Sequence, residues 1–567
     1  MNCKISAVLL VAALLTGTLT ACTGAGIQSS SVVSRQSASS AGTASAAQVS
    51  PAPSSRQSAV RISIGPEPES LDPALSSTED TDAYCAAAFE GLYKVNAAGK
   101  TVLGQAQKAV VSADKKVWTF TLRSDARWSD GTAVKAQDFV YAWRRNIQLA
   151  DAQQKELFAY LKNGEEILSG SNTDVSSLGA EALDDQTLRV TLASPCELLP
   201  QMLMRPVFMP LRSDIVASHN SWDHSPDTFI CNGPMKMTQW NVKTNIIYAR
   251  SSTYYDVSQV NVSILTCMLS EDDETRLSSY DNNETSYISS LPVKYYTRIR
   301  ERGDMSTSAA GTECLQFNTK VDALSDAQVR KALSLAIDRD TLAVATTGMH
   351  FTPAAAFVPT GFVDAGGKND FRTVGGSCYK VSADDYSANV TSARTLLEQA
   401  GYAGGKNFPQ LTITVPISSL DSAAANAIAQ MWKTQLGISC TVSVQPRKTY
   451  QQNCRKGNVQ MTISRVTPAY EDPSAYLENF VSDGFGSMTG WKDNTFQAQM
   501  TSARRSAAGS TQRYSALHAA EKRLAEEAPA VALFYMPSLS LRDSRLNGIF
   551  TTQSGVTYFV YARLFTD

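Results

Sequence analysis

Residues 411–445, which read LTITVPISSLDSAAANAIAQMWKTQLGISCTVSVQ, decide the fold class of this 567-residue chain. Apolar residues alternate with threonine over 411–415, which predicts a β-strand. A helix is predicted over about 424–436, and Gly437 can take the left-handed conformation that ends it. Alternation returns over 438–444, so a second strand follows. Because a helical crossover joins parallel strands, this part of the chain is predicted to be α/β.

Two amphipathic helices are predicted upstream of this unit. The first begins at Ser325, which forms a capping box with Gln328, while Leu324 and Val329 form a hydrophobic staple. Its apolar residues recur at helical spacing and predict one buried face, made of Val329, Ala332, Leu333, Ala336 and Ile337. The second helix runs to Ala400 and is followed by a glycine that can end it.

The earlier part of the chain is predicted to hold shorter elements. Residues 117–123 alternate between apolar and polar side chains, which indicates a half-buried strand, and a tight turn follows at 129–131. A helix is predicted over 136–145. This short-element character extends over about 89–211.

The N-terminus has the pattern of an exported lipoprotein. Residues 1–21 carry an early lysine and a short apolar run, which is typical of a signal peptide, and the run is too short for the alternative of an uncleaved spanning helix. They end in Leu-Thr-Ala before Cys22, which resembles the bacterial lipobox. We therefore expect Cys22 to be acylated and to become the mature N-terminus, because two or more acyl chains give a stable membrane anchor. Plain secretory cleavage with Cys22 as a free thiol is the alternative.

Residues 22–58 are predicted to be a disordered tether. They consist of Ser, Ala, Gly, Thr, Gln and Pro with few large apolar residues, so ordering them would not be offset by burial. The remaining chain, 43% hydrophobic and 18% charged overall, is long enough for two or three packed lobes.

Charge and metal-ligand content exclude several classes of partner. A net charge of -2 and the lack of a basic cluster argue against a nucleic-acid partner. Four histidines and no Cys/His cluster at ligand spacing give no reason to expect a metal or another cofactor. Eight cysteines lie beyond Cys22, and an exported location permits disulfides, but buried free thiols are the alternative and the pairing does not follow from the spacing.

A series of short motifs, in order along the chain, resembles the extracellular solute-binding proteins of the oligopeptide, dipeptide and nickel type. The resemblance covers nearly all of the chain after the tether. The matching motifs are 89–93 (FEGLY), 118–123 (WTFTLR), 128–132 (WSDGT), 138–143 (DFVYAW), 232–234 (NGP), 329–333 (VRKAL), 336–339 (AIDR), 353–354 (PA), 357–359 (FVP), 400–402 (AGY), 436–438 (LGI) and 470–473 (YEDP). Each is weak alone, and function still has to be argued from a site.

The resemblance implies an α/β fold of the class II periplasmic-binding-protein type, with two lobes, an additional third lobe and discontinuous domains. The outer lobe is expected to comprise 59–88, 212–316 and 535–567. The additional lobe is 89–211, and the second α/β lobe is 317–534.

The resemblance also implies a function. The lobes are expected to close over a short peptide, which an ABC importer's permease subunits then receive. The protein would act as a monomer on the outer face of the cytoplasmic membrane, held there through Cys22.

Two segments are expected to bind the peptide main chain by β-augmentation, as in peptide-binding members of the family. Both are placed by their position relative to the matched motifs, and a surface loop is the alternative for the first. Trp432 matches a tryptophan that lines a side-chain pocket, although a core position would suit it equally. The first segment is Ser77, Thr78, Glu79 and Asp80, and the second is Val466, Thr467, Pro468 and Ala469; Tyr470, directly after the second, is also expected at the site.

Ala469 departs from the family pattern. Oligopeptide receptors place an aspartate there, which pairs with the ligand's α-amino group. Either another carboxylate takes this role, with Glu79, Glu471 and Asp472 as candidates, or the protein does not select a free amine. Arg465, and also Arg455, could instead meet a ligand carboxylate.

Three rival functions remain open. A hydrolase would need a nucleophile or metal motif, and none is legible, so we expect no enzyme activity. A lipoprotein that senses peptides would have the same sequence features. The same fold could also bind a non-peptide or N-blocked solute.

Overall fold

The computed structural model describes residues 58–76, 78–347, 351–481, 488–552 and 554–565. The predicted signal peptide, Cys22, the tether before residue 58 and Ser77 lie outside the described residues. Within them, no helix has the length and apolar character needed to cross a bilayer.

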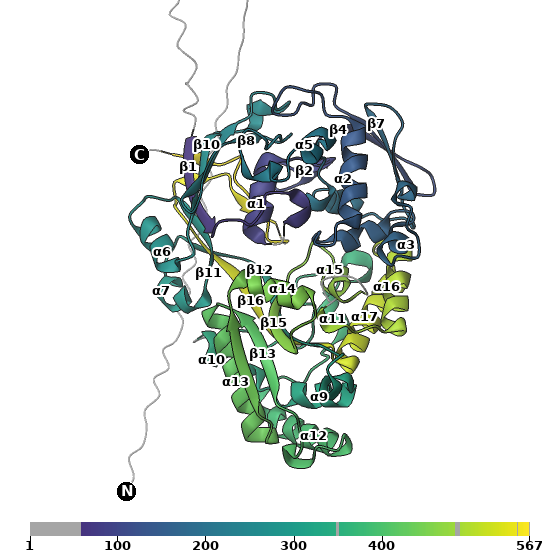
Figure 1. The fold of residues 1–567 in the computed structure, drawn as a ribbon, viewed down its shortest axis with the longest axis vertical. Coiled ribbons are helices and arrows are strands. Elements are labelled where there is room, and N and C mark those ends of the chain that lie inside the picture. Colours follow the sequence, from purple (N-terminus) through teal and green to yellow (C-terminus); the bar gives the residue numbers. More distant parts are fainter. Residues whose placement is uncertain (1–57, 77, 348–350, 482–487, 553, 566–567) are drawn as a thin grey trace, which may run out of the picture. The chain divides into compact units, whose positions relative to one another are not determined.

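A ten-stranded mixed sheet forms the centre of the fold (Figure 1). Its strand order is β14 (Cys440–Gln445), β13 (Leu411–Pro416), β15 (Met461–Val466), β12 (Met305–Phe317), β16 (Ala530–Arg542), β11 (Tyr287–Leu291), β1 (Ser58–Gly65), β10 (Val262–Leu269), β9 (Asn245–Arg250) and β8 (Met235–Asn241).

The other strands form smaller sheets, all of them antiparallel. One has the order β4 (Ala106–Val111), β5 (Val117–Leu122), β7 (Thr187–Thr191) and β6 (Ala180–Ala182), and the pairs are β2 (Tyr93–Val95) with β3 (Thr101–Leu103), β17 (Leu546–Asn547) with β20 (Arg563–Leu564), and β18 (Phe550–Thr551) with β19 (Thr557–Tyr558).

The helices surround these sheets. They are α1 (Glu79–Ala88), α2 (Ala136–Gln148), α3 (Gly164–Leu168), α4 (Leu199–Met202), α5 (Ser213–Ser218), α6 (Asp273–Asp281), α7 (Tyr296–Ile299), α8 (Asp322–Ser325), α9 (Ala327–Leu335), α10 (Arg339–Thr347), α11 (Phe371–Gly375), α12 (Tyr386–Gln399), α13 (Ser419–Leu436), α14 (Arg447–Arg455), α15 (Ser474–Leu477), α16 (Asn494–Arg505) and α17 (Thr511–Glu527).

The predicted strand–helix–strand unit is confirmed. β13 and β14 pair in parallel over their whole length, from Leu411 with Cys440 to Pro416 with Gln445, and α13 crosses between them. Gly437 ends α13 with a φ of 73°, in the left-handed region that favours glycine. The α/β fold class therefore follows from this unit, as expected.

Two long strands connect the halves of the ten-stranded sheet. β12 and β16 have 13 residues each and pair antiparallel. β12 also pairs with β15 on one side, and the end of β16 pairs with β11. In Figure 1 these two strands run between the group around β1, β8 and β10 and the group around β13 and β15.

The predicted start of the first amphipathic helix is wrong by one residue. Asp326, not Ser325, caps α9, and its carboxylate accepts a hydrogen bond from the Gln328 N–H at 2.8 Å. Ser325 instead closes the short helix α8, and its hydroxyl donates to the Asp322 carbonyl at 2.7 Å. An aspartate is an equally good cap, and the extra turn of α8 places it, not the serine, at the helix entrance. The predicted buried face is confirmed, with its five residues at most 2% exposed.

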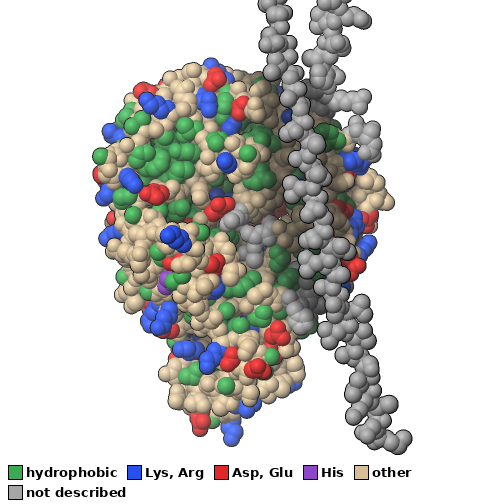
Figure 2. All heavy atoms as spheres, turned by 180° about the vertical axis from the view of Figure 1, so that it is seen from behind, with side chains coloured by type: hydrophobic (Ala, Val, Ile, Leu, Met, Phe, Trp, Pro, Cys, Tyr) green, Lys and Arg blue, Asp and Glu red, His purple; other side chains and the backbone are tan. Residues whose placement is uncertain are grey.

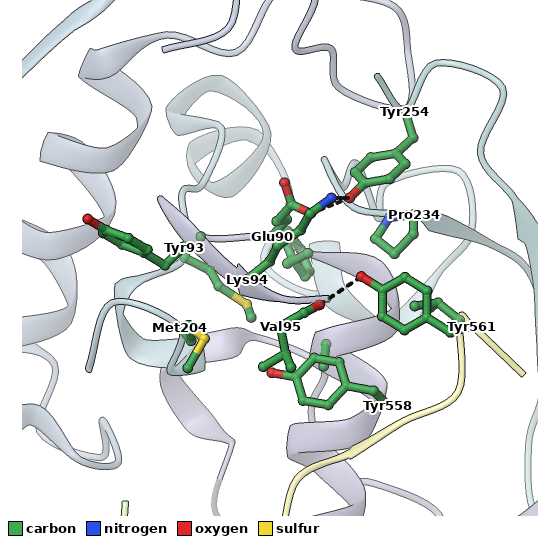
Figure 3. Close-up of a pocket in the computed structure, with 14 residues that line it drawn as sticks. Glu90, Tyr93, Lys94, Val95, Met204, Pro234, Tyr254, Tyr558 and Tyr561 are labelled. Carbon is green, nitrogen blue, oxygen red and sulfur yellow. Dashed lines mark hydrogen bonds and ion pairs between the residues drawn. The ribbon is translucent and has the colours of Figure 1, made fainter. Parts of the chain in front are cut away.

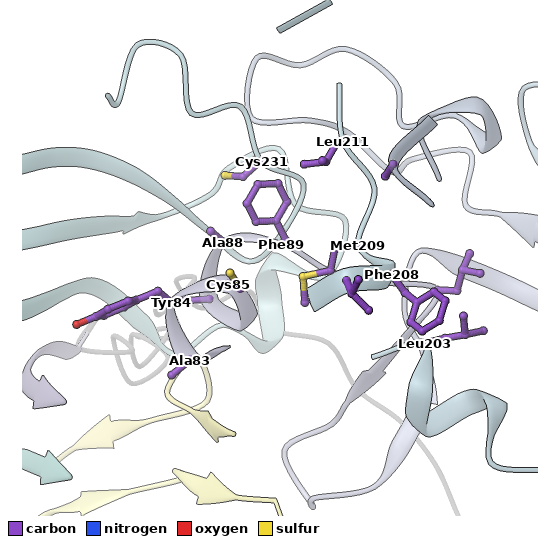
Figure 4. Close-up of a cluster of buried hydrophobic side chains, with 14 of the residues drawn as sticks. Ala83, Tyr84, Cys85, Ala88, Phe89, Leu203, Phe208, Met209, Leu211 and Cys231 are labelled. Atoms are coloured by element: carbon purple, nitrogen blue, oxygen red, sulfur yellow. The ribbon is translucent and has the colours of Figure 1, made fainter. Parts of the chain in front are cut away.

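The earlier part of the chain forms a packing layer that shares one hydrophobic cluster with β1 and β10. The strand and helix predicted over 117–123 and 136–145 correspond to β5 and α2. Figure 4 shows Phe89, the residue that follows α1, beside Cys231, and Cys85 of α1 belongs to the same buried cluster. This layer fixes α1, which matters because α1 begins at a residue predicted to bind ligand.

The cysteines and the surface agree with the composition. The eight cysteines of the described residues are free thiols, and five are buried: Cys85, Cys196, Cys231, Cys267 and Cys314. The free-thiol interpretation is therefore the one that the structure supports.

On the face shown in Figure 2, acidic and basic side chains are intermixed, as expected for a chain of small net charge.

Candidate solute-binding site

The carboxyl ends of three neighbouring parallel strands bring charged residues together. β13 pairs in parallel with both β14 and β15, so the three strands end at the same edge of the sheet. Asp421 follows β13, Arg447 follows β14, and Arg465 lies near the end of β15. Ligands of open α/β sheets bind outside such edges.

Arg465 is the central cation of this group. Its Nε donates to Glu313 Oε1 at 2.6 Å, and the two residues are register partners on β15 and β12. A Cβ at Gly311 would come within 2.5 Å of Arg465 Cδ, so the arginine needs a glycine beneath it. The Glu313 side chain is 4% exposed and that of Arg465 is 29% exposed, so the arginine is the partner that solvent or a ligand can reach.

Glu79 lies close enough to Arg465 for the two charges to interact. It is the first residue of α1, which Thr78 caps. The Ser538 hydroxyl, on β16, donates to Glu79 Oε2 at 2.8 Å. Burial raises the pKa of Glu79, and the Arg465 guanidinium opposes the rise. Burial likewise raises the pKa of Asp80, against the opposing hydrogen bond from Thr78.

Asp421 completes a site with an excess of carboxylates. Burial raises its pKa to about 7, the Glu313 carboxylate adds to the rise, and Arg465 opposes it. Arg465 thus interacts with three carboxylates, those of Glu313, Glu79 and Asp421. A ligand ammonium would be favoured here, and a ligand carboxylate would not. The alternative, that Arg465 meets a ligand carboxylate, stays an untested prediction.

The segment after Arg465 presents few side chains to a ligand. Val466 is 1% exposed and pairs with Thr312, Thr467 is exposed, and Pro468 is buried. Ala469 is half-buried, whereas the Tyr470 side chain is 2% exposed.

Asp472 is held by contacts within the fold. It is 4% exposed and accepts hydrogen bonds from Arg513 Nη2 at 2.7 Å and from the Ser474 hydroxyl at 2.6 Å. Glu471 is exposed. A structural role in the turn therefore accounts for the contacts of Asp472. Of the candidate carboxylates, Glu79 is the one that lies beside Arg465.

Trp432 is not brought into this group. It is fully buried in the core between α13 and its neighbours, and its indole N–H donates to the Leu333 carbonyl at 2.8 Å. A position in the core therefore explains why the Trp432 side chain is buried.

Sequence reasoning missed Asp421, Glu313 and Ser538. One signal was present for Asp421, because it lies in the first turn of a helix that directly follows a predicted parallel strand. No local signal marked Glu313 or Ser538, which lie within long strands.

A small, partly open cavity elsewhere has no room for a solute. It measures about 30 Å³, the room of a water molecule, and lies among Glu90, Lys94, Tyr254 and Tyr561 (Figure 3). Lys94 Nζ donates to the Tyr254 hydroxyl at 3.0 Å, and Tyr561 donates to the Val95 carbonyl at 2.7 Å. These closed contacts make it part of the core.

Known proteins resemble this chain over most of its length. The dipeptide-binding protein DppE of Bacillus subtilis (strain 168) is 27% identical over 487 residues, which cover 85% of this chain and 88% of DppE. The structure of the Escherichia coli murein tripeptide binding protein MppA matches with a TM-score of 0.80 at 26% identity, covering 90% of this chain and 99% of MppA. MppA in its unliganded open form matches with a TM-score of 0.61 at 27% identity, covering 90% and 97%.

The family assignment rests on a match to the family itself. Residues 100–487 match the description "Bacterial extracellular solute-binding proteins, family 5 Middle". That match covers more than half of the chain, and the resemblance drawn from its short motifs points to the same group. The chain belongs to the bacterial extracellular solute-binding proteins of family 5, which are extracytoplasmic binding proteins of transport and not enzymes.

Proposed function

We propose that this protein captures short peptides and delivers them to the permease subunits of an ABC importer. The observation that carries the proposal is the charged group at the carboxyl ends of β13, β14 and β15, where Arg465, Glu313, Asp421 and Glu79 converge. The peptide assignment is supported by relatives named for binding dipeptides and murein tripeptides.

In this proposal the protein is lipid-anchored through Cys22 on the outer face of the cytoplasmic membrane and acts as a monomer. It comprises an outer lobe (59–88, 212–316 and 535–567), an additional lobe (89–211) and a second α/β lobe (317–534). β12 and β16 pass between the outer and second lobes, so they would carry the hinge motion of closure.

The residues 78–80 and 465–470 line the cargo site in this proposal, and Glu79 takes the role of the missing aspartate at Ala469. An ammonium beside Glu79 and Asp421 would stabilise the charged form of each carboxylate. Binding the charged amine would therefore be more favourable than binding its neutral, acetylated form.

Two measurements test the proposal. Native mass spectrometry of the purified, untreated protein is expected to show a co-purified peptide. Calorimetric titration with tri-alanine and with N-acetyl-tri-alanine is expected to show a preference of at least about tenfold for the free amine. Glu79→Gln should remove the preference, whereas the control Glu471→Gln, at an exposed carboxylate, should keep it. Equal affinity of the wild type for the two peptides would refute the amine anchor, and a non-peptide adduct would refute the cargo.

A further inference from the structure

Several polar contacts connect residues 89–211 with residues 317–534. The Tyr160 hydroxyl donates to Glu478 Oε1 at 3.1 Å. The Glu471 N–H donates to Gln201 Oε1 at 3.0 Å. On α3, Glu165 accepts weaker bonds of 3.5 Å from two residues of α16, and these helices lie side by side in Figure 1.

The contact at Tyr160 is the buried one. Tyr160 ends the 3-10 helix η2 (Lys155–Tyr160) and is 3% exposed. Its hydroxyl also lies 3.2 Å from the hydroxyl of Tyr470, the residue that ends the proposed cargo segment. Tyr470 packs into the same hydrophobic cluster as residues of the 89–211 segment. Tyr160 therefore contacts both a buried carboxylate and the cargo segment's last residue.

The partner of Tyr160 is a buried ion pair. Glu478 begins the 3-10 helix η11 (Glu478–Phe480) and is 2% exposed, and Arg504 of α16 is 6% exposed. Arg504 Nε donates to Glu478 Oε1 at 3.1 Å, and its guanidinium lies 5.7 Å from the Tyr160 ring centroid. A hydroxyl bond to a charged, buried acceptor is stronger than one between neutral groups.

Two structures of one relative bear on the overall arrangement. MppA matches this structure with a TM-score of 0.80 in one structure and 0.61 in its unliganded open form. The fold as a whole is therefore nearer to the former than to the open form.

We propose that Tyr160 is a latch that holds the 89–211 segment against the 317–534 segment, through Glu478 and Tyr470, and so sets the lifetime of bound cargo without touching it. The idea rests on the proposed function, because closure matters only to a receptor. If only closed molecules retain cargo, the apparent dissociation constant rises as the closed fraction falls. Tyr160 is a positioning residue in this account.

The test compares Tyr160→Phe, which removes only the hydroxyl, with Tyr141→Phe on α2 of the same segment. Small-angle X-ray scattering of the full chain after removal of ligand should give a larger radius of gyration for Tyr160→Phe alone. Hydrogen exchange over 470–478 should become about tenfold faster in that variant. If tri-alanine binds, its dissociation rate constant should rise by a similar factor in Tyr160→Phe, while its association rate constant should stay unchanged.

The outcomes separate this inference from the proposed function. If tri-alanine does not bind the wild type, the cargo assignment fails, but scattering and exchange still test the latch. If Tyr160→Phe matches Tyr141→Phe in scattering and exchange, the latch is refuted whatever the peptide does. Thermal unfolding confirms that each variant is folded.

Discussion

Arg465 and Glu313 face each other across β15 and β12, with the guanidinium Nε 2.6 Å from the carboxylate. The carboxylate is buried while the guanidinium reaches the edge of the site. The pair therefore links the interior of the sheet to the proposed cargo, and its loss should alter both stability and binding.

Arg465→Met should destabilise the protein and make its stability more dependent on pH. Removing one partner of a buried pair leaves an uncompensated charge, which costs about 3 kcal/mol. The Arg465 guanidinium lowers the pKa of both Glu79 and Asp421, so without it both pKa values would be higher, and protonation at lower pH would neutralise these carboxylates. Urea unfolding should show a larger deficit at pH 8 than at pH 6, and an equal deficit at both would contradict this account.

Asp421→Asn should change the pH dependence of stability in a defined direction. The pKa of Asp421 is raised from 3.8 to about 7, so the folded protein holds this proton more tightly than the unfolded chain does. The contribution of the Asp421 carboxyl to the free energy of unfolding is fully present below about pH 4 and is lost as the pH rises through about 7. The variant should therefore gain stability over the wild type as the pH rises from 5 to 8. A constant difference between the two in urea unfolding would show that Asp421 is not perturbed.

Asp472→Asn should act on folding and not on amine selection. Asp472 and Arg513 are both buried and form an ion pair of 2.7 Å that holds the turn after Tyr470. Breaking it should lower the free energy of unfolding by about 3 kcal/mol. Calorimetry with tri-alanine and its N-acetylated form should still show the wild-type preference. A variant of normal stability that lost the preference would make Asp472 the amine partner.

Local sequence patterns were enough to predict several helices and strands, whereas the make-up of the candidate site depends on tertiary contacts. The strand–helix–strand over 411–445 could be predicted because alternation, helical spacing and a terminal glycine are all local signals. The cap at Ser325 was misplaced because Asp326 offers an equally good side chain one residue later. Trp432 shows the limit of a family motif, since its position in a helix suited a pocket and a core equally until its packing was known.

The charged group had no local signal because its members come from distant parts of the chain. Glu79, Glu313 and Arg465 lie on α1, β12 and β15, and only the order of the ten-stranded sheet brings them together. Which carboxylate replaces an aspartate at Ala469 is therefore a question about strand order, and the sequence around Ala469 does not contain the answer.

Closure of residues 89–211 against residues 317–534 should be accompanied by protonation of Glu156. This residue lies on the same 3-10 helix as Tyr160. Burial raises its pKa from 4.5 to about 7, the Glu478 carboxylate adds to the rise, and Arg504 and Lys155 oppose it. If residues 89–211 moved away from residues 317–534, Glu156 would regain solvent and a pKa near its usual value.

The closed form then binds this proton more tightly than the open form between about pH 4.5 and 7, so the closed fraction should rise as the pH falls from 8 to 6. Small-angle scattering of the ligand-free protein should give a smaller radius of gyration at pH 6 than at pH 8. Glu156→Gln should reduce this difference, because its neutral side chain carries no charge to desolvate at either pH, whereas Glu166→Gln at an exposed carboxylate of α3 should leave it unchanged. A Glu156→Gln protein that keeps the full pH response would assign the proton to another group, with Asp421 as the next to test.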